Sequence, residues 1–159
     1  MDTNPIPDQR QIVRPENFVH LLGFDFNEKA TLRAVFNVAY RTKINRETGE
    51  YTIKVSSFKP SSAIRGPKNA THFKIIFAAM EIDFYNKTEN HTYKNSSEIF
   101  IIDNTFTIPL TMTHNLTPGS TATLCITVGL AFIDQTGNYF TTRDQQRVVN
   151  PLSLVDISI

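Results

Sequence analysis

Apolar and polar residues alternate with a period of two over most of the chain that follows residue 15. In residues 31–45 the even positions are mostly apolar and the odd positions mostly polar. A helix repeats its buried face about every 3.6 residues, whereas a strand with one buried face repeats it every second residue. We therefore predict a long strand over residues 31–45, in place of the helix that "EKATLRAVFNVAYR" also suggests.

Other segments repeat this pattern. Residues 45–50, "NRETGE", supply a turn at Gly49, and the alternation that follows predicts a β-hairpin. In residues 71–85 the apolar phase switches at Met80, which indicates either a bulge or a central strand covered on both faces. Pro109 lacks the N–H that a ladder needs, so it places the strand of residues 106–116 at a sheet edge. The remaining predicted strands lie in residues 97–103, 122–134, 139–144 and 151–159, and residues 86–98 are predicted to form a polar loop.

These segments amount to about seven or eight strands without a strong helical one. That pattern predicts an all-β fold, an antiparallel β-sandwich with an immunoglobulin-like architecture over residues 16–159. Residues 1–15 contain three prolines and little apolar content, so we expect an extended N-terminal arm. Chain ends are ordered only when something holds them, and a neighbouring subunit is one candidate.

Composition narrows the classes of partner. A formal net charge of +1 without a block of like charges argues against nucleic-acid binding, and the apolar runs are too short for membrane insertion. Cys125 is the single cysteine, so an intrachain disulfide is excluded, and its apolar surroundings predict a buried, unreactive thiol. The start of the sequence does not look like a signal peptide. The compartment stays open between the bacterial cytoplasm and export by a signal-independent route.

Five Asn-x-Ser/Thr sequons raise the question of glycosylation; they begin at Asn69, Asn86, Asn90, Asn95 and Asn115. A sequon is only an acceptor and requires a eukaryotic-type secretory route. We interpret these sequons as incidental, a consequence of the many Asn and Thr residues in a polar loop, and not as glycosylation sites.

The reactive residue types do not form a recognisable catalytic or metal-binding motif. The four histidines lack metal-ligand spacing, and residues 103–105 and 134–138 resemble calcium loops but carry too few acidic residues, so turn chemistry is the better interpretation. Glu81 and Asp83 lie two residues apart on one strand. They suggest either a glycoside-hydrolysing pair or a solvated strand end, and we favour the strand end. We predict no catalytic residue, cofactor or metal ligand.

Four aromatic residues suggest an interaction surface: Phe18, Tyr85, Tyr93 and Tyr139. Aromatic rings supply much contact area at low entropic cost, in protein docking and in stacking on sugars. The alternative is a structural role within the sandwich or at its rim.

Four stretches together resemble a set of uncharacterised, β-rich proteins from Bacteroidota. They are "LLGFDFN" (21–27), "NATHFKIIFAAMEIDF" (69–84), "TVGLAFIDQTGNYF" (127–140) and "NPLSLVDI" (150–157), and their order is kept over about residues 20–157. The resemblance implies a bacterial origin, and with it incidental sequons. Its motifs are not catalytic and imply no activity. Those proteins carry a longer, basic, helix-forming N-terminal segment where this chain has "DQRQIVRPENF".

Three functions remain as hypotheses. The first is a non-enzymatic structural or protein-interaction β-sandwich, a subunit of a bacterial homo- or hetero-oligomer that associates with itself or a protein partner through its N-terminal arm. The second is a carbohydrate-binding module that uses aromatic residues and Asn/Thr-rich loops. The third is a sandwich hydrolase that uses Glu81 or Asp83, which would require both carboxylates to line a cleft.

Overall fold

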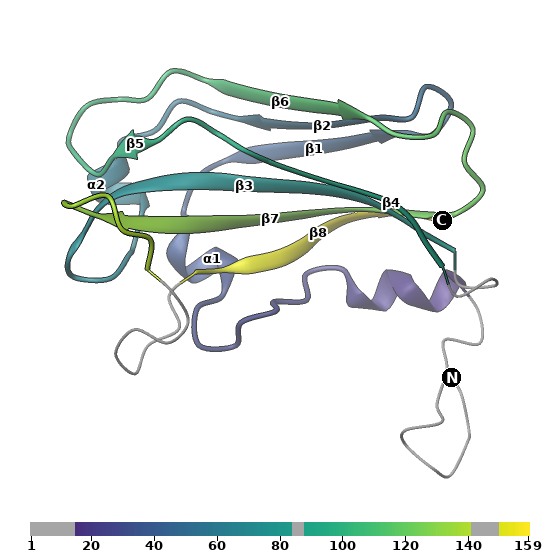
Figure 1. Cartoon of the computed structure of the whole chain (residues 1–159), viewed down its shortest axis with the longest axis horizontal. Coiled ribbons are helices and arrows are strands. Elements are labelled where there is room, and N and C mark those ends of the chain that lie inside the picture. Colours follow the sequence, from purple (N-terminus) through teal and green to yellow (C-terminus); the bar gives the residue numbers. More distant parts are fainter. Residues whose placement is uncertain (1–14, 84–87, 141–149) are drawn as a thin grey trace, which may run out of the picture.

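The computed structural model describes residues 15–83, 88–140 and 150–159, and it consists mainly of two antiparallel sheets (Figure 1). One sheet has three strands in the order β1-β2-β6. The other has five, in the order β4-β3-β7-β8 with β5 also paired to β3. The strands are β1 (Tyr40–Asn45), β2 (Glu50–Val55), β3 (Ala70–Asp83), β4 (Thr88–Ser96), β5 (Phe100–Ile101), β6 (Leu110–Asn115), β7 (Thr123–Asp134) and β8 (Leu152–Ser158). The predicted all-β, sandwich-like arrangement of two sheets is confirmed.

The hairpin β1–β2 and the edge position of β6 match the sequence predictions. Gly49 closes the hairpin at φ 70°, a left-handed conformation that side chains other than glycine rarely adopt. A Cβ atom there would also lie 2.7 Å from the carbonyl oxygen of Leu116. β6 follows Pro109 and pairs with β2 at the end of its sheet.

β3 lies at the centre of the five-stranded sheet, between β4 and β7. Its odd-numbered residues from Phe73 to Glu81 are buried, and its even-numbered residues from Lys74 to Ile82 are half-buried. The burial pattern is therefore continuous through Met80, where the sequence suggested a change of phase. The pairing with β4 is irregular between Glu81 and Ile82, but the additional residue there lies on β4, so β3 has the central position that the sequence offered as the alternative to a bulge.

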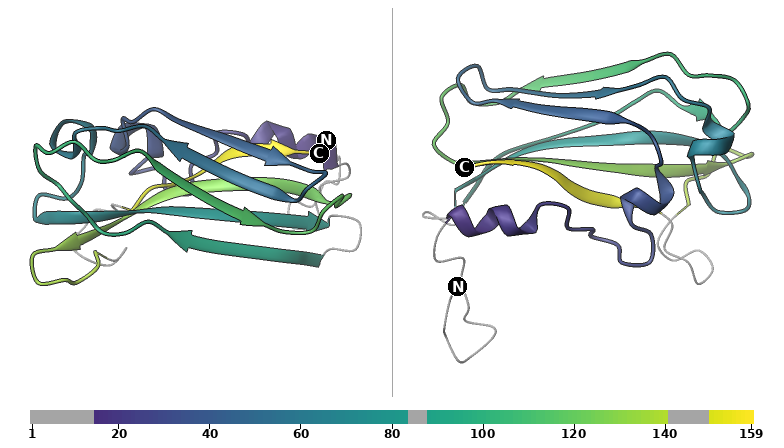
Figure 2. Two further views of the ribbon diagram at one scale, coloured as in Figure 1. Left: turned by 90° about the horizontal axis from the view of Figure 1, so that it is seen from above. Right: turned by 180° about the vertical axis from the view of Figure 1, so that it is seen from behind.

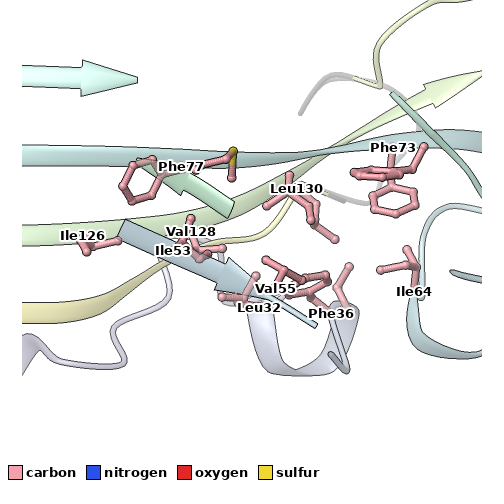
Figure 3. Packing of buried hydrophobic residues seen from close by; sticks show 14 of the residues in the cluster. Leu32, Phe36, Ile53, Val55, Ile64, Phe73, Phe77, Ile126, Val128 and Leu130 are labelled. Atoms are coloured by element: carbon pink, nitrogen blue, oxygen red, sulfur yellow. The ribbon is translucent and has the colours of Figure 1, made fainter. Parts of the chain in front are cut away.

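The core lies between the two sheets (Figure 3). Alternate residues of β7, such as Val128 and Leu130, face alternate residues of β2, such as Ile53 and Val55. Aromatic rings extend the core towards β5, where the rings of Phe73 and Phe100 stack with centroids 5.4 Å apart. Burial of these apolar side chains supplies the main driving force for folding.

The chain before β1 covers the free edge of β8. The short 3-10 helix η2 (Pro15–Leu21) packs against β8, and the segment after it runs alongside the strand (Figure 2). The N–H of Gly23 donates to the carbonyl of Leu154 at 2.7 Å, and the N–H of Phe26 donates to the carbonyl of Leu152 at 2.8 Å. Residues 23–26 therefore pair with β8 in an antiparallel direction and form the outermost segment at this edge of the sheet.

Two predictions of secondary structure are wrong. Residues 32–35 form the short helix α1 (Leu32–Val35), because the Thr31 side chain accepts from the N–H of Ala34 and a carboxylate oxygen of Asp25 accepts from the N–H of Leu32. The predicted polar loop contains the strand β4, whose backbone pairs with β3. A second short helix, α2 (Pro60–Ala63), lies in the connection between β2 and β3.

Some predictions fall outside the described residues. They include the arm up to residue 14, Tyr85 and most of the strand expected over residues 139–144. No helix in the described part of the chain is long and apolar enough to cross a membrane.

Candidate interaction face

The outer faces of the two sheets differ sharply in polarity. On the three-stranded sheet the outward side chains are polar and most of them are exposed; among the exposed ones are Arg41, Lys43, Lys54, Thr111 and Thr113. Such residues are typical of a surface that stays in contact with water.

The outer face of the five-stranded sheet is mainly apolar. Strand register places its side chains together, because directly paired residues point to the same side of a sheet. Lys74 pairs with Ala131, Ile76 with Gly129, Ala78 with Thr127, Thr127 with Leu154, and Gly129 with Leu152. We call the following set the apolar outer face: Phe24, Phe26, Lys74, Ile76, Ala78, Met80, Ile99, Ile101, Thr127, Gly129, Ala131, Tyr139, Leu152 and Leu154.

One edge of this face is formed by Phe24 and Phe26. Asp25 bridges to Ser153, which lies opposite the core residue Val128, so Asp25 points inward and the two phenylalanines point outward. Their rings meet edge to face with centroids 5.2 Å apart, yet they remain 50% and 57% exposed. These two rings form a contiguous, accessible apolar surface at this edge.

The opposite edge is formed by Ile99 and Ile101. Ile101 pairs with His72, which is out of phase with the buried Phe73, so Ile101 points outward; Ile99 lies two residues earlier, immediately before β5. These isoleucines are 52% and 56% exposed. The face therefore carries protruding apolar side chains at both edges.

Gly129 lies at the centre of the face, on β7. It is required there by packing, because a Cβ atom would lie 2.5 Å from the carbonyl oxygen of Pro151. Ile76 of β3 and Leu152 of β8 pair with it directly, and Thr127 and Ala131 lie two residues away on the same strand.

The charge on this side of the sheet comes from Lys74 and from Lys94, which is exposed and pairs with Ala78. The Lys74 ammonium lies 6.0 Å from the centroid of the Tyr139 ring, a cation–π distance that draws the charge towards one end of the face. Cys125, on the same side of β7, is fully buried, and burial raises the pKa of its thiol to about 12. Its thiolate is scarce near neutral pH, so chemistry at this cysteine does not define the face.

The four aromatic residues predicted from the sequence do not form one cluster. Tyr139 lies on the apolar outer face and is 49% exposed. Tyr93 is half-buried at the other side of the sheet, where its ring stacks on His114 of β6 with centroids 3.3 Å apart. Phe18 is half-buried on η2.

Glu81 is not solvated, contrary to our interpretation of the sequence. It is 1% exposed, and its carboxylate accepts a hydrogen bond from the N–H of Thr117 at 2.8 Å. The nearby Tyr51 is fully buried, and its hydroxyl has no hydrogen-bond partner. Burial, and secondarily the charge of Glu81, raise the pKa of this hydroxyl. Asp83 is half-buried at the end of β3.

The two calcium-like segments form turns whose carboxylates accept hydrogen bonds from their own residues. Asp103 accepts from the N–H and the hydroxyl of Thr105. Asp134 accepts from Thr136 and Asn138, and the Thr136 hydroxyl is the main cause that lowers the pKa of Asp134. Among the described residues, no three His, Cys, Asp or Glu side chains gather as metal ligands would.

The sequence analysis missed the residues at both edges of the face. A signal was present, since Leu22, Phe24 and Phe26 alternate with Gly23 and Asp25, and Ile99 and Ile101 flank Phe100 in the same manner. Alternation alone does not tell which of two faces is buried.

Comparison with known proteins identifies no relative. No protein-family model, curated protein or solved structure matches the chain.

Proposed function

We propose that this protein is a non-enzymatic interaction module, a β-sandwich subunit of a homo- or hetero-oligomeric bacterial assembly. The observation that supports it is the apolar outer face of the five-stranded sheet, opposite a polar outer face on the other sheet. An apolar surface with accessible aromatic and aliphatic side chains favours association with another macromolecule. The proposal extends to an immunoglobulin-like architecture and to a role for residues 1–15 as a contacting arm.

The buried groups support a binding role over a catalytic one. Glu81 faces the interior of the sandwich, where its carboxylate holds the backbone that follows β6. A glycosidase requires two carboxylates on either side of an accessible substrate. Glu81 is better suited to fixing a loop than to proton transfer.

Native mass spectrometry and light scattering on the full chain and on a variant lacking residues 1–15 test this function. We expect the full chain to associate, and the deletion to weaken the association if the arm contributes to it. A strictly monomeric protein that the deletion leaves unchanged would count heavily against an interaction role.

Carbohydrate binding is the alternative that this test must separate. It would use accessible aromatic platforms, but the ring of Tyr93 is stacked on His114, and the expected Asn/Thr-rich loop contains a paired strand. Tyr139 remains exposed beside Asn138. Binding to immobilised glycans that Tyr139→Ala abolishes would favour this alternative.

A further inference from the structure

We propose that the partner of the apolar outer face is a second copy of this chain, bound face to face in a two-fold dimer. This inference rests on the proposed function and names its partner. It goes beyond that function by assigning the contact to the outer face of the five-stranded sheet rather than to the N-terminal arm.

The area of the face matches what a dimer requires. Five large side chains on it are about half exposed: Phe24, Phe26, Ile99, Ile101 and Tyr139. Half of a large side chain corresponds to roughly 100 Å², and the half-buried residues between the edges add less, so the face offers roughly 700 Å². A stable interface of standard size buries about 800 Å² on each partner.

Part of the outer side of β7 is already covered within the single chain. Its outward residues Cys125, Thr127 and Ile133 are as buried as many core residues. The apolar groups that a second copy would contact therefore lie at the two edges of the face and on the outward side of β3, which includes Ile76 and Met80.

A copy of the same chain suits the edges of this face because their exposed groups are apolar. In a two-fold contact both copies present the same surface patch, so like charges would repel while apolar groups would not. Lys74 and Lys94 lie on this side of the sheet; the Lys74 ammonium is drawn towards Tyr139, and Lys94 is exposed on β4 beside Ala78, so the two-fold axis has to keep the copies of each lysine apart. The formal net charge of +1 adds little repulsion between two copies.

The test is sedimentation analysis of the full-length protein and of single variants at both edges of the face. Phe26→Glu and Ile101→Glu each place a charge on it, and Ile108→Glu is the matched control. Ile108 is 72% exposed in the segment that leads into β6 of the other sheet. Circular dichroism verifies folding, and Ile101→Ser replaces a variant that does not fold.

We expect a dimer in the wild type and in Ile108→Glu, and a dissociation constant raised about tenfold or more by either face substitution. A wild type that stays monomeric up to about 100 µM overturns the dimer, because such weak association would not serve an assembly. An association that survives both face substitutions, or that only the deletion of residues 1–15 removes, overturns it while leaving an interaction role intact. A monomer that the deletion also leaves unchanged counts against both proposals.

Discussion

The hydroxyl of Tyr51 is an individual group whose removal should not weaken the fold. It is fully buried and unpaired, and the negative charge of Glu81 nearby further disfavours its ionisation. A buried polar group without a partner costs about 1–3 kcal/mol relative to solvent. We expect Tyr51→Phe to leave the free energy of unfolding unchanged or to raise it by about 1 kcal/mol, as measured by urea denaturation.

Ser97 provides the matched comparison, since it is a buried hydroxyl with partners. Its Oγ accepts from the N–H of Ile75 at 3.0 Å and donates to the carbonyl of Glu98 at 2.7 Å. We expect Ser97→Ala to lower the free energy of unfolding by about 1–2 kcal/mol, because these backbone groups lose their partner. If Tyr51→Phe destabilised the protein as much as Ser97→Ala, the hydroxyl of Tyr51 would have to be bonded in solution.

Arg46 connects three elements that the sheet hydrogen bonds leave separate. From the turn between β1 and β2, its guanidinium donates to the carbonyls of Ser120 and Ala122 before β7, and to the hydroxyl of Ser158 at the end of β8. A lysine keeps the charge but cannot present this planar set of donors. We therefore expect Arg46→Lys to lower the free energy of unfolding by about 1–2 kcal/mol.

Arg41 is the control for this substitution because it lies exposed on the outer face of the three-stranded sheet. Arg41→Lys should change stability by less than about 0.5 kcal/mol. Equal effects of the two substitutions in urea denaturation would show that Arg46 does not hold these elements together.

The strands that could be predicted from the sequence are those in which apolar and polar, or large and small, side chains alternate according to which side is buried. β3 alternates in burial because one side of it faces the core, and β7 alternates large apolar residues on its core side with smaller ones such as Gly129 on the other. β4 has no such alternation, because most of its residues are polar, among them Asn, Thr and Lys. It forms a strand because its backbone pairs with β3. Residues 32–35 alternate like a strand but form a helix, since Asp25 caps a segment several residues away in sequence.

The candidate site was predictable only in part, for a related physical reason. Tyr139 was identified as an accessible aromatic residue, and it lies on the apolar outer face. Phe24 and Phe26 were not identified, because their outward direction follows from the pairing of residues 23–26 with β8. Pairing with a strand that is distant in sequence decides which side of an alternating segment faces solvent, and the local sequence pattern does not contain that information.

At the scale of the whole molecule, the proposed dimer makes thermal stability depend on protein concentration. Association that involves only the folded state shifts the folding equilibrium by mass action, so the melting temperature rises with concentration. We expect a hundredfold dilution to lower the wild-type melting temperature by several degrees, because each factor of ten corresponds to about 1.4 kcal/mol and a domain of this size shifts about 2–4 °C per kcal/mol. Differential scanning fluorimetry and calorimetry at matched concentrations provide the measurement. The melting temperature of Ile101→Glu should be lower than that of the wild type at each concentration where the wild type is dimeric, while Ile108→Glu should follow the wild type. If the melting temperature of the wild type also did not change with concentration, the folded chain would be a monomer whose apolar outer face stays exposed to solvent, and the proposed dimer would be wrong.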